Sequence, residues 1–269
     1  MKTNMGVALV TGASSGIGKA TAVALNAAGY RVYGTSRKAV ASTDGITMLV
    51  CDVTKEDSVH RMVSEVLSLA GGIDLLVNNA GIGLLGGAEE SSSAQAQALF
   101  DVNVFGVLRV TNAVLPTMRL QRKGRIINMS SILGLIPSPY NALYAATKHA
   151  IEGYSESLDH ELRTLGIRVV LVEPGLTRTS FEESITRPDR RDSLYDSERS
   201  RMEALMRRGI ETGDDPEVVA EAVVKAAMAK VPKRRYTAGK QACQVSLLRR
   251  FLPEAVVDRS LRKFNGLPG

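Results

Sequence analysis

The stretch Val7-Ala-Leu-Val-Thr-Gly-Ala-Ser-Ser-Gly-Ile-Gly18 decides the fold. An apolar run is followed at once by a glycine-rich turn with the spacing G-x-x-x-G-x-G, and an amphipathic segment comes next. This order favours a dinucleotide site over an ordinary turn, because glycine lets the backbone approach a pyrophosphate and a helix N-terminus offers unpaired N–H groups. The turn residues that we expect to contact a cofactor are Gly12, Ser14, Ser15, Gly16, Ile17 and Gly18.

The rest of the chain repeats the alternation of strand and helix. Apolar runs that suit strands buried on both faces of a parallel sheet occur at 7–10, 31–35, 46–50, 74–77, 124–129 and 168–172. Helical patterns occur at 55–69, 92–120, 143–164 and 216–230, and a capping box is expected at 54–57. We therefore predict a single-domain α/β fold, a doubly wound parallel sheet of about seven strands with helices on both faces and ligands beyond the carboxyl ends of the strands.

The bulk composition fits one globular domain of this kind. The chain has 269 residues, of which 44% are hydrophobic and 23% charged. Only Cys51 and Cys243 are present, so a disulfide framework is not expected. The first strand starts near residue 7 and no apolar run looks long enough to span a bilayer, so we expect a cytoplasmic protein without a signal peptide. The histidines lack metal-ligand spacing, and no metal is expected.

The net charge of +6 is unevenly distributed along the chain. Residues 230–269 contain ten Lys and Arg against two acidic residues, which gives +8 and leaves −2 for the residues before them. No recognisable nucleic-acid module carries these charges, so we expect no nucleic-acid partner.

The chain divides into a dinucleotide-binding catalytic domain at 1–240 and a basic helical extension at 241–269. We expect the extension to pack on the same domain. Contact with a membrane surface is the less favoured alternative, since Pro253 interrupts the helix. The apolar stripe behind both interpretations is Val245, Leu248, Leu252, Val256 and Leu261.

One interval interrupts the strand–helix rhythm. Residues 176–212 show no strand pattern, are densely charged and contain isolated apolar residues. Because the interval directly follows the carboxyl end of a strand, we expect it to form a lid over the substrate; a solvated surface excursion is the alternative.

Ser131, Tyr144 and Lys148 form a candidate proton-transfer group. Tyrosine and lysine four residues apart on a helix share a face, so the ammonium lies close to the phenol. A nearby positive charge favours the ionised phenol, whose ordinary pKa near 10 makes it a poor acid or base at neutral pH.

The motifs occur in chain order at the expected strand ends: Thr11-Gly12, Gly16-Ile-Gly18, Asn78-Asn-Ala-Gly81, Asn103, Ser131, Tyr144-x-x-x-Lys148 and Pro174-Gly175. Together, over roughly residues 6–240, they strongly resemble the short-chain dehydrogenase/reductase family, which has a Rossmann fold. The tail after Arg235-Tyr-Thr-Ala-Gly239 is similar to that of the NADP-preferring, 17β-hydroxysteroid dehydrogenase-like branch.

The resemblance implies roles for individual residues. Tyr144 donates a proton to a carbonyl oxygen or removes one from an alcohol, and Ser131 polarises that oxygen. Lys148 lowers the tyrosine pKa and holds the nicotinamide ribose. Asn103 shapes a water site for proton relay near the lysine. The equal alternative is that Asn103 has only a structural role inside a helix. The further cofactor contacts that the resemblance implies are Asp52, Val53, Asn79, Ala80, Gly81, Tyr144, Lys148, Pro174, Gly175, Thr177 and Thr179.

The end of the second strand favours NADP(H) over NAD(H). An acid there would accept a hydrogen bond from the ribose 2′-hydroxyl and repel a 2′-phosphate. Ser36 occupies that position and Arg37 follows it, and a guanidinium matches phosphate geometry.

The expected function is an NADP(H)-dependent oxidoreductase that interconverts an apolar ketone or aldehyde and its alcohol. The expected substrate contacts are Ser131, Leu133, Tyr144 and Phe181. A β-ketoacyl thioester reductase would share these residues, and a catalytically idle nucleotide-sensing protein is the third alternative. The resemblance also implies a homodimer or homotetramer.

Overall fold

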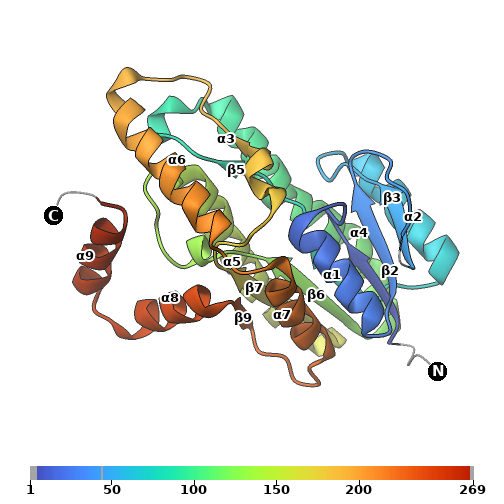
Figure 1. The fold of residues 1–269 in the computed structure, drawn as a ribbon. Coiled ribbons are helices and arrows are strands. Elements are labelled where there is room, and N and C mark those ends of the chain that lie inside the picture. Colours follow the sequence, from blue (N-terminus) through green and yellow to red (C-terminus); the bar gives the residue numbers. More distant parts are fainter. Residues whose placement is uncertain (1–4, 44, 267–269) are drawn as a thin grey trace.

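The computed structural model describes residues 5–43 and 45–266. Residues 1–4 and 44 of the expected catalytic domain and residues 267–269 of the expected extension lie outside the described residues. A seven-stranded sheet forms the centre of the fold, with strand order β3-β2-β1-β4-β6-β7-β9 and parallel pairing throughout (Figure 1). The strands are β1 (Val7–Val10), β2 (Arg31–Ser36), β3 (Ile46–Val50), β4 (Leu75–Asn78), β6 (Gly124–Met129), β7 (Ile167–Pro174) and β9 (Arg235–Ala238). This architecture confirms the predicted doubly wound sheet.

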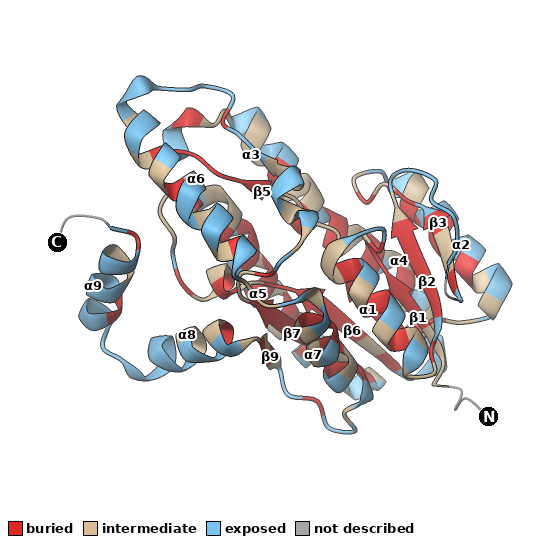
Figure 2. Cartoon of the chain, in the orientation of Figure 1, coloured by how far each residue is buried: buried red, intermediate tan, exposed pale blue. Residues whose placement is uncertain are grey.

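Helices cover both faces of the sheet. On one face α1 (Gly16–Ala27) and α7 (Pro216–Met228) pack against Val10, Val77 and Val170. On the other face α2 (Glu56–Ala70), α4 (Gly106–Gln121) and α5 (Ala142–Leu162) pack against Leu9, Leu76 and Ile126. Strands alternate between the two faces, and the central strands β1, β4, β6 and β7 are apolar toward both, which is why they appear buried in Figure 2. The edge strand β9 contributes only Tyr236 and Ala238 to the apolar core.

The long helix expected at 92–120 is divided in three. It consists of α3 (Ser93–Phe100), a π-helical turn (Asp101–Phe105) and α4. By length and composition, residues 93–121 could cross a membrane, contrary to our expectation that no run was long enough. Val110, Val114 and Met118 are nevertheless fully buried against the sheet, so α4 serves as a core helix of the fold.

The prediction of a capping box at 54–57 is wrong. The helix begins at Glu56, and Lys55 is the N-cap residue, without a side-chain cap hydrogen bond. The hydroxyl of Thr54 donates instead to Asp52 Oδ1 at 2.8 Å. Thr54 therefore stabilises the turn after β3, at the rim of the site described below.

The interval 176–212 contains a strand that the sequence did not reveal. Residues Ile185–Thr186 form β8, which pairs in parallel with β5 (Gly83–Leu84). The charged part that follows is the helix α6 (Asp196–Glu211), and short 3-10 turns occupy Ser180–Ser184 and Ser193–Tyr195. A two-residue strand has no periodicity, so the pattern could not predict it.

A buried ion pair fastens this interval to the loop after β5. Arg199 of α6 pairs with Glu90, and both side chains are almost fully shielded from solvent. Glu90 also accepts hydrogen bonds from the backbone N–H groups of Gly87, at 2.8 Å, and Asp192, at 2.9 Å. Burial alone would raise the pKa of Glu90, but these hydrogen bonds and Arg199 hold it below its usual value. Glu90 lies in the turn Ala88–Glu90.

The C-terminal extension forms two helices, α8 (Lys240–Phe251) and α9 (Glu254–Phe264), at one side of the molecule (Figure 1). Ala242, Val257 and Asn265 are buried. Most other residues are exposed, including three members of the expected apolar stripe, namely Leu248, Leu252 and Val256. The stripe is therefore not buried along its length against the body of the fold.

Candidate active site

A cavity of about 1710 Å³ lies at the carboxyl ends of the strands. Its wall brings together every site residue predicted from the sequence except Asn103. These are Gly12, Ser14, Ser15, Gly16, Ile17, Gly18, Ser36, Arg37, Asp52, Val53, Asn79, Ala80, Gly81, Ser131, Leu133, Tyr144, Lys148, Pro174, Gly175, Thr177, Thr179 and Phe181. One continuous space therefore joins the glycine turn to the candidate catalytic residues.

The glycine turn is tightly built. A Cβ on Gly18 would lie 2.1 Å from the carbonyl oxygen of Gly12, and Gly12 itself has φ of +65°, so both positions require glycine. Thr11 Oγ1 accepts hydrogen bonds from the N–H groups of Asn79, at 2.9 Å, and Ala80, at 3.0 Å. These bonds hold the turn against the end of β4 and leave the N-terminus of α1 facing the cavity. Such a cradle suits a pyrophosphate.

The rim near β2 and β3 has the charge pattern expected from the sequence. Arg37 is exposed and lines the cavity next to Ser36, the last residue of β2. Across the rim, burial would raise the pKa of Asp52, but hydrogen bonds from Thr54 and the nearby Lys55 and Arg37 lower it below its usual value. Asp52 is therefore ionised at neutral pH and available as an acceptor.

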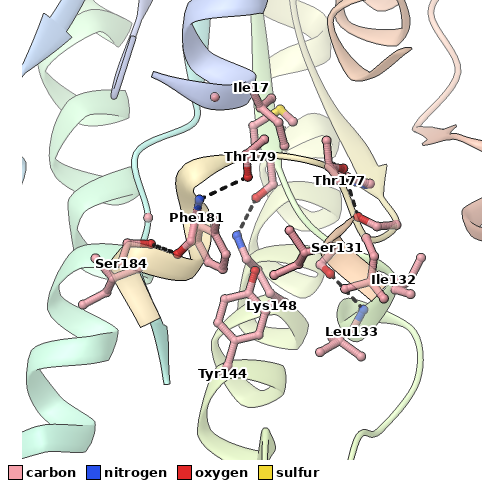
Figure 3. Close-up of a pocket in the computed structure, with 18 of the residues that line it drawn as sticks. Ile17, Ser131, Ile132, Leu133, Tyr144, Lys148, Thr177, Thr179, Phe181 and Ser184 are labelled. Atoms are coloured by element: carbon pink, nitrogen blue, oxygen red, sulfur yellow. Dashed lines mark hydrogen bonds between the residues drawn. The ribbon is translucent and has the colours of Figure 1, made fainter. Parts of the chain in front are cut away.

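Tyr144 and Lys148 extend from α5 into the cavity, as Figure 3 shows. The lysine Nζ lies 5.6 Å from the centre of the tyrosine ring and donates to the carbonyl oxygen of Met129 at 2.9 Å. Ser131 lies at the N-terminus of a 3-10 turn, Ile132–Gly134, where its hydroxyl accepts from the N–H of Leu133 at 3.2 Å. The predicted trio therefore meets at the end of β6.

Burial determines the proton affinities of the tyrosine and the lysine. It raises the pKa of Tyr144, and a hydrogen bond with the Ser131 hydroxyl offsets this only in part. It also lowers the pKa of Lys148 to about 8, although the nearby Glu152 carboxylate acts in the opposite direction. The expected lowering of the tyrosine pKa by the lysine is thus not found, because desolvation of the phenol dominates. Tyr144 holds its proton at neutral pH.

Asn103 lies behind the cavity wall. Its side chain accepts from the N–H of Ile82 and donates to the carbonyl oxygen of the same residue, both at 2.9 Å, and its Nδ2 lies 3.3 Å from Thr147 Oγ1. The π-helical turn at this position directs the amide toward the loop after β4. Asn103 therefore joins that loop to α5, as a structural asparagine would.

The part of the cavity beside Tyr144 contains apolar side chains. The ring of Phe181 lies 6.1 Å from that of Tyr144, centre to centre, and Thr179 Oγ1 accepts from the N–H of Phe181 at 3.2 Å. Leu133 also lines this region. The interval 176–212 therefore places an aromatic ring directly beside the candidate proton donor (Figure 3).

Sequence reasoning did not find two further groups of cavity residues. Met202, Leu205 and Met206 of α6 line the cavity, and so do residues of the C-terminal extension. The latter are Val245, Leu248, Leu261 and Phe264. Val245, Leu248 and Leu261 belong to the predicted apolar stripe, but a helical stripe alone does not show which surface it faces.

A buried acidic cluster lies next to Lys148, one turn further along α5. Arg235 Nε lies 2.9 Å from Glu152 Oε2 and 3.0 Å from Glu173 Oε1, and its Nη1 lies 2.8 Å from Glu156 Oε1. Glu173 is fully shielded from solvent. Burial, followed by repulsion from Glu152, raises the pKa of Glu173 to about 8 in spite of Arg235.

The raised pKa of Glu173 predicts a pH-dependent stability. A carboxyl with a raised folded pKa stabilises the fold fully below its ordinary pKa of 4.5 and loses that contribution as pH rises through about 8. We expect Glu173→Gln to have the wild-type Tm near pH 5 and a higher Tm than the wild type above pH 8. The gain above pH 8 should correspond to on the order of 1–3 kcal/mol of unfolding free energy. Measurements of Tm for both proteins from pH 5 to above pH 8 test this prediction.

The control is Glu156→Gln, which changes a more exposed partner of the same arginine and should show no pH-dependent difference in Tm from the wild type. Equal pH profiles of Tm for Glu173→Gln and the wild type would refute the raised pKa of Glu173.

Among the described residues, no group of three or more His, Cys, Asp and Glu side chains is placed to hold a metal ion.

Comparison with known proteins agrees with this architecture. The short chain dehydrogenase family model matches residues 6–190. The 3-ketodihydrosphingosine reductase of Bacteroides thetaiotaomicron is 37% identical over 262 residues, covering 96% of this chain and 97% of that protein. Bovine retinol dehydrogenase 8 is 36% identical over 255 residues, covering 85% and 80% respectively. A short-chain dehydrogenase from Streptomyces avermitilis superimposes with a TM-score of 0.85 at 32% identity, covering 99% and 98% of the two chains.

The chain therefore belongs to the short-chain dehydrogenase/reductase family of oxidoreductases.

Proposed function

We propose that this protein is an NADP(H)-dependent oxidoreductase that interconverts an apolar ketone or aldehyde and its alcohol. The observation that carries the proposal is the single cavity in which a protonated Tyr144 and Ser131 share an apolar compartment with Phe181 and open directly onto the glycine turn. A carbonyl compound held there lies within reach of both hydroxyls.

The residues of the cavity fit a nicotinamide cofactor. The backbone cradle at Gly12 and Gly18 leaves no room for side chains and suits a pyrophosphate, and Arg37 suits a 2′-phosphate. When bound, the cofactor supplies or accepts the hydride.

The chain itself handles the proton. In reduction the carbonyl carbon gains a hydride and the oxygen gains the proton of Tyr144, while the Ser131 hydroxyl orients that oxygen. The raised pKa of Tyr144 keeps the proton on the phenol until the developing alkoxide takes it. Lys148, held by Met129, places a positive charge beside the phenolate that remains.

The substrate side supports an apolar, lipid-like carbonyl. Phe181, Leu133 and the methionines of α6 line this compartment, and the relatives above are named for 3-ketodihydrosphingosine and retinol. A screen of NADPH consumption across long-chain ketones, steroids, retinoids and acyl thioesters tests this proposal. Reduction of apolar ketones or aldehydes supports it, whereas activity confined to β-ketoacyl thioesters would replace it with the thioester reductase.

Arg37 provides the test of cofactor preference. We expect Arg37→Asp to raise the KM for NADPH by about ten- to a hundredfold and to lower the KM for NADH, because the guanidinium is replaced by a group that repels a 2′-phosphate. Steady-state kinetics with both cofactors measure this effect. Arg31→Asp makes the same charge change at the exposed opposite end of β2 and should leave the preference unaltered. An unchanged preference in Arg37→Asp would contradict the NADP(H) assignment.

A further inference from the structure

The C-terminal helices α8 and α9 expose an unusual amount of apolar side chain. On α8, Leu247, Leu248 and Phe251 lie on one side of the helix at i, i+1 and i+4 and are 59%, 50% and 72% exposed. On α9, Phe264 is 66% exposed. Both helices are largely exposed in Figure 2, away from the layers of the sheet. Side chains of this kind in water mark a binding surface when they gather in one place.

Positive charge surrounds the same side chains. Arg249 and Arg250 follow Leu248 directly, and the Arg250 guanidinium lies 5.5 Å from the centre of the Phe251 ring. Arg259 and Lys263 of α9 are exposed as well. The two helices carry a net charge of +4, because residues 240–264 contain six Lys and Arg against Glu254 and Asp258. Apolar side chains flanked by arginine and lysine match the interface of an anionic bilayer.

The exposed surface is continuous with the mouth of the active-site cavity. Leu248 is both exposed and part of the cavity wall, and so is Phe264. Leu205 of α6, which is 38% exposed, lines the same cavity. An apolar path therefore leads from the tips of α8 and α9 toward Phe181 and Tyr144.

We propose that α8 and α9 form a docking surface for an anionic lipid bilayer, with the mouth of the active-site cavity facing the membrane. The charge disfavours the simplest alternative occupant, a second copy of the same surface. A twofold pairing would bring together two surfaces that each carry a net charge of +4. Anionic headgroups instead neutralise these cations while the leucines and phenylalanines enter the interface.

Vesicle sedimentation of the full chain tests the proposal. The wild type should sediment with vesicles of phosphatidylcholine and phosphatidylserine in equal parts, much less with phosphatidylcholine alone, and less as salt rises. Arg249→Glu/Arg250→Glu and Leu247→Ser/Phe251→Ser should each weaken binding by about tenfold or more. The control variants Arg61→Glu and Leu120→Ser each change one exposed residue, an arginine of α2 and a leucine of α4, and should bind as the wild type does.

Three results would overturn the proposal. The first is a wild type that stays in the supernatant with both kinds of vesicle. The second is tail variants that bind as tightly as the controls. The third is a wild type that does not bind vesicles but forms an oligomer in analytical ultracentrifugation, and whose oligomer is dissociated by Leu247→Ser/Phe251→Ser. That result would make this surface a subunit interface. Because sedimentation requires no turnover, its outcome is independent of the proposed oxidoreductase function.

Discussion

Tyr144→Phe is expected to lower kcat for carbonyl reduction by about a thousandfold or more while NADPH affinity changes by less than about twofold. The substitution removes one hydroxyl, and with it the proton that the developing alkoxide requires, an effect worth about 10²–10⁴ in rate. The ring remains, so its packing against Phe181 is retained. Single-turnover reduction and NADPH fluorescence titration measure the two quantities separately.

The control for this substitution is Tyr140→Phe. Tyr140 lies four residues earlier, and its ring packs edge-on against Tyr195, 6.3 Å away centre to centre. It should retain most of the wild-type activity. Near-normal turnover by Tyr144→Phe would show that another group supplies the proton and would refute the mechanism.

Arg199→Met is expected to lower the free energy of unfolding by about 3 kcal/mol. It leaves Glu90 buried without its charged partner, and breaking a buried ion pair from one side costs about 3–5 kcal/mol. Denaturant unfolding measures this loss. Amide hydrogen exchange should become faster within residues 176–212, because Glu90 also accepts a hydrogen bond from the N–H of Asp192.

Arg201→Met is the matched control on the same helix. Arg201 pairs with Glu198, and both side chains are about 40% exposed, so the loss should stay within about 0.5 kcal/mol. Glu90→Leu combined with Arg199→Met should recover part of the stability, because no unpaired charge remains. Equal effects of Arg199→Met and Arg201→Met would contradict the anchoring role of the buried pair.

The sheet and the cofactor side of the site could be predicted from the sequence because they depend on local signals. The glycine turn after Val10 needs residues without side chains, and the i, i+4 spacing of Tyr144 and Lys148 places both on one face of a helix. The central strands β1, β4, β6 and β7 are apolar toward both faces, so runs of apolar residues marked their positions. The edge strand β9, Arg235–Ala238, contains no such run.

The substrate side depends on contacts between distant segments. Glu90 and Arg199 are more than a hundred residues apart, and nothing in either neighbourhood signals their pairing. The strand Ile185–Thr186 forms only because Gly83–Leu84 offers an edge. The tyrosine pKa was expected to fall because the lysine is near in sequence, whereas the extent of burial, which the sequence does not give, raises it.

The central claim is that hydride passes between the cofactor and an apolar carbonyl in the cavity at Tyr144. Reduction of a long-chain ketone with NADPH carrying deuterium at C4 of the nicotinamide ring, followed by mass spectrometry of the alcohol, measures this directly. When the deuterium lies on the face of the nicotinamide ring from which the hydride leaves, one deuterium should appear on the carbinol carbon for each NADPH consumed. NADPH oxidation without deuterium in the alcohol, from NADPH labelled on either face, would contradict the account.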